Sequence, residues 1–116
     1  MLRSPKELQL EQAENLRDGQ GVITMKHLFK REELTGKARL VAETIVPPGA
    51  SIGFHRHTHE EEIYFILSGK GQVIDEDEVK EVGPGYAMLT GGGNGHSIIN
   101  TGTEPLVFLA VILLFQ

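Results

Sequence analysis

Glycine divides this sequence into short apolar segments, and this division constrains the fold more than any other feature. The 116 residues include 14 glycines, which are spread between the apolar segments rather than gathered in a low-complexity linker. Many short apolar segments separated by turn-forming residues are typical of an all-β sandwich or barrel. The segments that we expect to form strands are 21–28, 38–46, 51–57, 62–67, 71–75, 79–82, 87–89, 96–100 and 106–115.

Two of these segments differ in how polar and apolar residues follow one another. From Arg39 to Val46 the two kinds interleave, as in a strand with one buried face. Segment 106–115 is apolar throughout, so we expect the opposite sheet to cover one of its faces and a second copy of the chain to cover the other. Together with the polar N-terminal residues, this pattern predicts a homodimer.

Helix signals occur at only two places. Ser4-Pro5-Lys6-Glu7 combines an N-cap residue, a proline at the first helical position and an acidic side chain, and we expect a helix from there to about Asn15. Residues 30–34 are expected to form one short helical turn. We find no internal repeat, and we expect residues 1–20 to form an N-terminal arm and residues 21–116 to form a single barrel domain.

Charge and cysteine content exclude several classes of function. The 11 Lys and Arg residues against 16 Asp and Glu give a net charge of −5, which argues against binding to nucleic acid or to an anionic membrane. The sequence has no cysteine, so any metal ion must be held by histidine and carboxylate side chains. Residues 1–20 lack the apolar region of a secretory signal, and segment 106–115 is shorter than the ~20 residues that span a bilayer. We therefore expect a soluble, cytoplasmic protein.

Histidines and glutamates gather in one stretch of the sequence. His55 and His57 lie two residues apart, so on a strand their imidazoles point to the same side. Glu62 follows on what we expect to be the returning strand, and the glycine-rich run 91–95 leads directly into His96. Glycine permits close approach of the backbone, so this run can bring His96 up to the other three. Imidazole and carboxylate together suit divalent ions from Mn to Zn.

These two blocks resemble the two motifs of the cupin superfamily. The first motif is Gly, five residues, His-x-His, three or four residues, Glu, six residues and Gly, and residues 49–69 match it. The second is Gly, five residues, Pro-x-Gly, two residues, His, three residues and Asn, and residues 85–100 match it except that Gly91 replaces the proline. The resemblance implies a cupin β-barrel, a jelly-roll-like double-stranded β-helix. It also implies four ligands for one divalent metal ion: His55, His57, Glu62 and His96.

Several neighbouring residues are alternatives to this ligand set. Glu61 also satisfies the spacing after His57, but only Glu62 places Gly69 six residues further on. His59 continues the spacing of the first two histidines and is either a fifth ligand or a surface residue. His27 is distant from both motifs, and we interpret it as structural. Tyr64 has the same strand parity as Glu62 and is a candidate substrate-binding residue.

The resemblance leaves two classes of function open. Short bacterial cupins that are likened to oxalate decarboxylases have a strand similar to residues 61–69, which suggests Mn or Fe as the ion, with Zn, Ni, Co and Cu as alternatives. In the first class the protein is a metal-dependent enzyme: decarboxylase-like, a dioxygenase or an isomerase. In the second it is a non-enzymatic module that binds a small carboxylate or sugar through the metal. Full decarboxylases have two cupin domains and a lid acid that we do not find here, so no catalytic residue is assigned.

Overall fold

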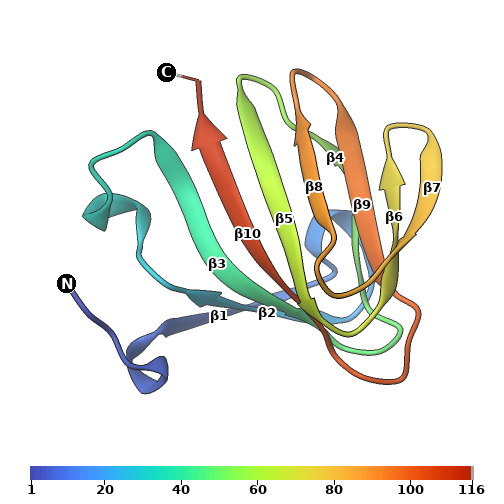
Figure 1. Ribbon diagram of the computed structural model, residues 1–116, viewed down its shortest axis with the longest axis horizontal. Helices are drawn as coiled ribbons and strands as arrows, with labels where there is room; N and C mark the ends of the chain where they lie inside the picture. The colour runs from blue at the N-terminus through green and yellow to red at the C-terminus, as the bar shows by residue number, and fades with distance from the viewer. Residues whose placement is uncertain (116) are drawn as a thin grey trace.

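The chain folds into two antiparallel sheets, as the computed structural model shows for the described residues, 1–115 (Figure 1). The larger sheet has six strands in the order β1-β2-β3-β10-β5-β8, and the smaller has four in the order β4-β9-β6-β7. This arrangement confirms the all-β, jelly-roll-like barrel that the sequence predicts. No helix among residues 1–115 is long and apolar enough to cross a membrane.

All of the segments that the sequence predicts as strands are strands, and their ends differ from the prediction by no more than two residues. The short helical turn expected at residues 30–34 is also present as a 3-10 helix. The strands are β1 (Gln9–Glu14), β2 (Val22–His27), β3 (Ala38–Val46), β4 (Ser51–Arg56), β5 (Glu60–Ser68), β6 (Gly71–Asp75), β7 (Glu78–Val82), β8 (Ala87–Gly91), β9 (Gly95–Asn100) and β10 (Leu106–Leu114). The 3-10 helices are η1 (Pro5–Glu7), η2 (Leu16–Asp18) and η3 (Arg31–Glu33).

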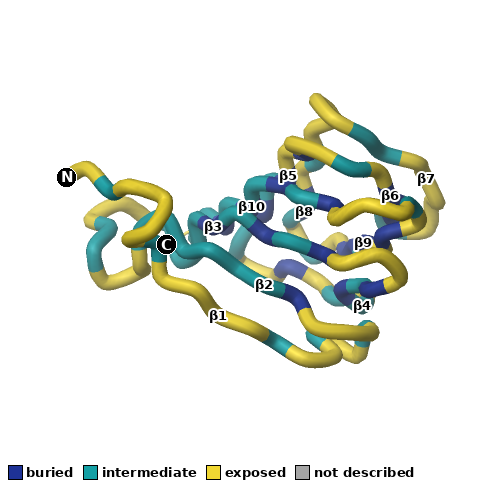
Figure 2. The backbone as a smooth tube through the Cα atoms, turned by 90° about the horizontal axis from the view of Figure 1, so that it is seen from below, coloured by how far each residue is buried: buried dark blue, intermediate teal, exposed yellow. Residues whose placement is uncertain are grey.

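The helix expected from Ser4 to about Asn15 is wrong beyond its first turn. Only Pro5–Glu7 is helical, and the next residues form β1, which pairs with β2 in a register that runs from Gln9 opposite His27 to Glu14 opposite Val22. The apolar residues of this stretch are too sparse to cover a core face as a helix, whereas an extended strand forms a full ladder of backbone hydrogen bonds with β2. Figure 2 shows β1 as a mostly exposed edge of the larger sheet.

The hydrophobic core lies between the two sheets, and β10 contributes most to it. Leu106, Phe108, Ala110 and Ile112 are buried on its inner face, and full burial of a large apolar side chain contributes roughly 1.5–3 kcal/mol. The alternate residues of β10 are only half-buried. Within one chain, the strand that is apolar throughout is therefore covered on one face, and its other face lies on the outside of the larger sheet.

Candidate metal centre

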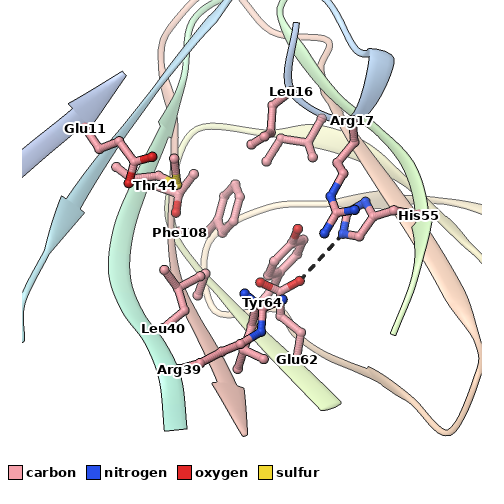
Figure 3. Close-up of a pocket in the computed structure, with 14 residues that line it drawn as sticks. Glu11, Leu16, Arg17, Arg39, Leu40, Thr44, His55, Glu62, Tyr64 and Phe108 are labelled. Atoms are coloured by element: carbon pink, nitrogen blue, oxygen red, sulfur yellow. Dashed lines mark ion pairs between the residues drawn. The ribbon is translucent and has the colours of Figure 1, made fainter. Parts of the chain in front are cut away.

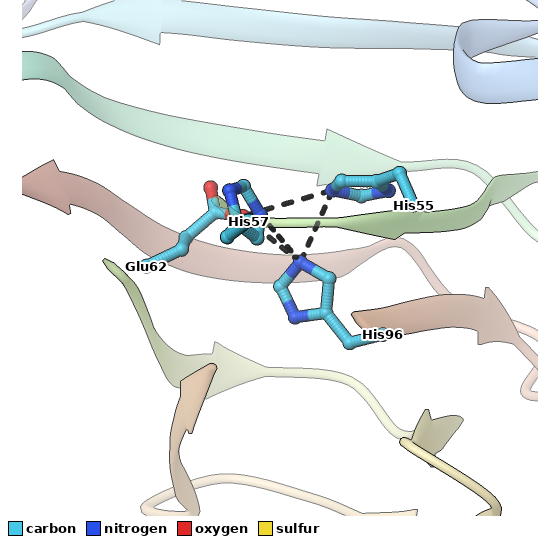
Figure 4. Close-up of side chains that lie close together, drawn as sticks. All are labelled: His55, His57, Glu62 and His96. Atoms are coloured by element: carbon cyan, nitrogen blue, oxygen red, sulfur yellow. Dashed lines mark hydrogen bonds and ion pairs between the residues drawn. The ribbon is translucent and has the colours of Figure 1, made fainter. Parts of the chain in front are cut away.

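Four side chains, from three strands and from the residue that follows β4, converge inside the barrel (Figure 4). His55 lies on β4 directly opposite His96 on β9, while Glu62 comes from β5 in the other sheet. His57 follows the end of β4 and is held by the glycine-rich loop: its N–H donates to the carbonyl of Asn94 at 3.1 Å, and its carbonyl accepts from the N–H of Gly93 at 2.8 Å. Two distant parts of the sequence therefore meet at one point, as the motif spacing predicts.

The spacing of the facing atoms tests whether this group fits a metal ion. An ion about 2.0–2.2 Å from each ligand, with neighbouring bonds near a right angle, needs ligand atoms about 2.8–3.1 Å apart. The Nε2 atom of His96 lies 3.0 Å from that of His57 and 3.1 Å from that of His55. Glu62 Oε1 lies 2.8 Å from His57 Nε2, 3.0 Å from His96 Nε2 and 3.9 Å from His55 Nε2. The group can hold one metal ion.

In two of these histidines, the hydrogen bond made by Nδ1 fixes Nε2 as the nitrogen that faces the other ligands. Nδ1 of His55 lies 2.8 Å from the carbonyl oxygen of Gly53, and Nδ1 of His57 lies 2.6 Å from a carboxylate oxygen of Glu60. Both partners only accept hydrogen bonds, so each Nδ1 carries the proton and donates. The Nε2 lone pairs are left to point inward, which is the form in which neutral imidazole binds a metal ion.

Glu60 is itself held in place from the other side. Its two carboxylate oxygens accept hydrogen bonds from Nε and a terminal nitrogen of Arg39, at 2.8 and 2.9 Å. This contact and the one to His57 lower the pKa of Glu60 to about 2 against the desolvation that opposes them. Arg39, Glu60 and His57 thus form a chain of charge-assisted hydrogen bonds that ends at a candidate ligand.

Burial and charge act on the ligand group together. His57, Glu62 and His96 are each less than 5% exposed. Burial raises the pKa of Glu62, but hydrogen bonds to the three imidazoles outweigh it and bring this pKa well below its usual range. Burial likewise lowers the pKa of His96, whereas the carboxylates of Glu62 and Glu60 raise that of His57 despite its burial. The site therefore holds a buried carboxylate in its ionised form, for which positive charge is the natural partner.

A cavity of about 220 Å³ opens beside the group, and His55 and Glu62 form part of its wall (Figure 3). Tyr64 also lines it and stacks on the ring of His96, with the ring centroids 4.7 Å apart. Burial raises the pKa of the Tyr64 hydroxyl well above its ordinary value, so the hydroxyl stays protonated. The lining also includes the apolar Leu40, Ile52, Phe108 and Ile112 and the charged Glu11, Arg17 and Arg39, so the cavity is small and combines apolar walls with charged groups.

The other residues that the sequence singled out lie outside the group. His59 is exposed, with a positive φ of 62°. Glu61 points away from the facing nitrogens because it has the opposite strand parity to Glu62. His27 lies on β2, where its Nε2 is 2.8 Å from a carboxylate oxygen of Glu11 on the neighbouring strand.

Gly91, which replaces the motif proline, lies against β5. A Cβ atom there would be 2.6 Å from the Cβ of Glu61 and 3.0 Å from the carbonyl oxygen of Glu60. A larger residue at this position would thus press on the strand that carries Glu60 and Glu62, and glycine allows the two strands to approach closely.

Three further residues lie around the group and are not among the residues predicted from the sequence. Strand parity alone could have found Glu60, because Glu60, Glu62 and Tyr64 alternate on one face of β5. For Arg39 and Arg17, which line the cavity from β3 and from η2, the sequence offers no local signal.

Fold and site together define a class of protein: small antiparallel β-barrels with three imidazoles and one carboxylate gathered on the inner face. A family model described as "Cupin domain" matches residues 42–112. The chain belongs to the cupin family.

The similarity to two individual proteins covers nearly the whole chain. An oxalate-binding protein of Thermotoga maritima is 42% identical over 114 residues, which cover 98% of this chain and 94% of that protein. The crystal structure of a predicted oxalate decarboxylase from Thermotoga maritima matches with a TM-score of 0.93 at 42% identity, covering 98% of this chain and 99% of the other. A glucose-6-phosphate isomerase of Thermococcus kodakarensis is 30% identical over 78% of this chain, but the match spans only 54% of that enzyme.

Proposed function

We propose that this protein binds one divalent transition metal ion through His55, His57, Glu62 and His96, and uses it to hold a small carboxylate, with oxalate as the first candidate. The observation that carries the proposal is the convergence of three imidazole nitrogens and one carboxylate oxygen at ligand spacing. The oxalate-binding protein of Thermotoga maritima, similar along almost its full length, supports oxalate as the ligand to test first.

The residues of the chain have distinct roles in this proposal. A bound ion would supply Lewis acidity and two positions beyond its four protein ligands, which suits a chelating carboxylate. His55 and His57 are pre-oriented by Gly53 and Glu60, so little rearrangement is needed to receive the ion. Tyr64 offers a protonated hydroxyl at the cavity wall, and we propose it as a donor to the bound ligand. Mn or Fe is the preferred ion, with Zn, Ni, Co and Cu as alternatives.

A second candidate is sugar isomerisation on the same ion. It is supported by the 30% identity to a glucose-6-phosphate isomerase, although this chain matches only about half of that enzyme. Turnover of oxalate, a diol or a sugar phosphate by the metal-loaded protein would assign an enzyme. Tight binding of oxalate without turnover would assign a binding module.

The metal proposal predicts about one divalent ion per chain after purification from a metal-replete medium. His55→Ala removes one ligand and should lose the ion, which elemental analysis measures directly. Retention of the ion should also fall as the pH drops and protons compete for the imidazoles.

A matched control comes from the same histidine-rich stretch. His59→Asn should retain the metal, because His59 lies outside the group and asparagine tolerates its left-handed backbone. Wild-type protein that carries no divalent transition metal ion after purification from a metal-replete medium would refute the proposal, as would equal metal content in His55→Ala and the wild type.

A further inference from the structure

The cavity beside the candidate metal centre has two arginines in its wall, and they differ in their contacts. Arg39 is engaged, since it donates two hydrogen bonds to Glu60. Arg17 makes no side-chain hydrogen bond or ion pair with any residue of the described chain, 1–115. In Figure 3 its side chain runs from the η2 loop into the cavity, toward His55. A free guanidinium therefore faces the same space as two of the candidate metal ligands.

The backbone that carries Arg17 is held in an unusual conformation. Asn15, Arg17 and Asp18 have positive φ angles of 54°, 55° and 63°. For residues other than glycine such angles cost roughly 1 kcal/mol or more each, and they persist only where the surrounding structure enforces them.

Contacts with β4, the strand that carries His55, enforce this conformation. A Cβ on Gly53 would overlap the carbonyl oxygen of Arg17, and one on Gly19 would overlap that of Ser51. Gln20 and Ser51 are also joined by two hydrogen bonds, of 2.9 and 3.0 Å. The position of Arg17 relative to the metal centre is thus set by direct backbone packing rather than by a mobile tail.

The charge balance of the site indicates which kind of ligand the guanidinium of Arg17 would bind. Two other charged side chains line the cavity, but Arg39 is paired with Glu60 and Glu11 is hydrogen-bonded to His27. At the ligand group itself, a divalent ion together with the Glu62 carboxylate leaves one positive charge. A bound dianion changes this to one negative charge, and the guanidinium of Arg17 neutralises it. Arginine also matches a carboxylate in shape, because it can donate two parallel hydrogen bonds. The cavity of about 220 Å³ is below the range of about 300–1,000 Å³ that holds drug-sized ligands, so the anion must be small.

We propose that Arg17 is a specificity-determining residue that pairs with a carboxylate of the bound ligand and selects small dicarboxylates over monocarboxylates and neutral sugars. This proposal rests on the proposed function, because it concerns the same ligand site. It assigns the N-terminal residues, expected from the sequence to be an arm, a part in ligand recognition.

The test is a calorimetric titration of the Mn-loaded protein with oxalate and, separately, with glyoxylate, which is similar in size but has one carboxylate. Arg17→Asn removes the guanidinium and suits the left-handed backbone. Its oxalate affinity should fall by about 10–100-fold, the loss expected for a charged hydrogen-bonding partner. Its affinity for glyoxylate should fall by a smaller factor, because the monoanion leaves no net negative charge for Arg17 to neutralise, and its affinity for Mn should be unchanged. Arg17→Lys should recover part of the oxalate affinity.

Arg31→Gln is the matched control, because Arg31 is exposed on η3 and is not part of the cavity wall. If Arg17→Asn binds oxalate as tightly as the wild type, the role of Arg17 is refuted while carboxylate binding stands. Equal losses for oxalate and glyoxylate would refute selectivity for dianions. If the Mn-loaded wild type binds neither acid, both this inference and carboxylate binding fail, although metal binding by the four ligands does not.

Discussion

At His57, two carboxylates contact the two nitrogens of one imidazole. Glu62 faces Nε2 at 2.8 Å and Glu60 faces Nδ1 at 2.6 Å. Only Glu62 belongs to the group of facing ligand atoms. Glu60 acts behind the ring, where it holds the proton on Nδ1 and leaves Nε2 free for the metal ion.

Replacing Glu60 tests this positioning role and has a defined dependence on pH. The folded protein lowers the pKa of Glu60 from 4.5 to about 2, mainly through Arg39. Its contribution to stability is therefore fully present above pH 4.5 and is lost as the pH falls toward 2. In metal-free protein, Glu60→Gln should lower the unfolding free energy at pH 6 by about 1–3 kcal/mol. The difference from the wild type should shrink near pH 2–3, as urea unfolding at the two pH values would show.

The same variant should weaken metal affinity by about 10–100-fold, as is typical when a ligand histidine loses its outer partner. Glu32→Gln, at an exposed position on η3, is the control and should change neither quantity. A stability difference between Glu60→Gln and the wild type that stays constant from pH 6 to pH 2.5 would contradict the assigned ionisation.

A residue of the candidate site could be predicted where a nearby residue or a fixed spacing in the sequence points to it. His55 and His57 follow from strand parity, and the choice of Glu62 over Glu61 follows from motif spacing. Glu60 shares the parity of Glu62, so the same rule could have found it. Arg17 and Arg39 come from segments that meet the site only through pairing between distant strands and packing of η2, which no local pattern records.

At the scale of elements, the packing of η2 against β4 depends on the absence of a side chain at Gly53. A Cβ there would overlap the carbonyl oxygen of Arg17. We expect Gly53→Ala to displace the η2 loop and to lower the unfolding free energy by about 1–3 kcal/mol, the usual cost of overpacking. Urea unfolding measures this loss.

Gly36→Ala is the matched control, because no atom lies within 4 Å of the Cβ position at Gly36 and its φ is not positive. This substitution should be close to neutral. If Gly53→Ala were as stable as Gly36→Ala, the close approach of η2 to β4 would not exist in solution.

A strand or helix could be predicted where the local sequence pattern fits only one type of secondary structure. Glycines between the apolar segments, and the alternation of polar and apolar residues within them, located the strands of both sheets except β1, which was predicted as helix. Its start signal is real, since η1 forms at Pro5–Glu7 with the capping box that begins at Ser4. What continues the chain as a strand is the free edge of β2, a tertiary partner that the local sequence does not reveal.

At the scale of the whole molecule, the outer face of the larger sheet carries an apolar patch over β3, β10, β5 and β8. On this face Leu109 is paired across strands with Phe65, and Val111 is paired with both Ile63 and Val41. On the sheet's free edge, Leu89 is 62% exposed. A contiguous apolar face of this kind is typical of an interface between protein chains.

We propose that a second copy of the chain covers this face and forms a homodimer, and we expect Leu89→Lys to weaken it. A stable dimer buries about 800 Å² per partner, and a charge placed inside such an area is costly to desolvate. Sedimentation or light scattering across a concentration series should find a dimeric wild type and a shift toward monomer in the variant. Val79→Lys is the matched control: Val79 is similarly exposed, at 60%, but lies on β7 in the smaller sheet. A wild type that stays monomeric at the highest concentration, or equal effects of both substitutions, would show that this face is not the interface.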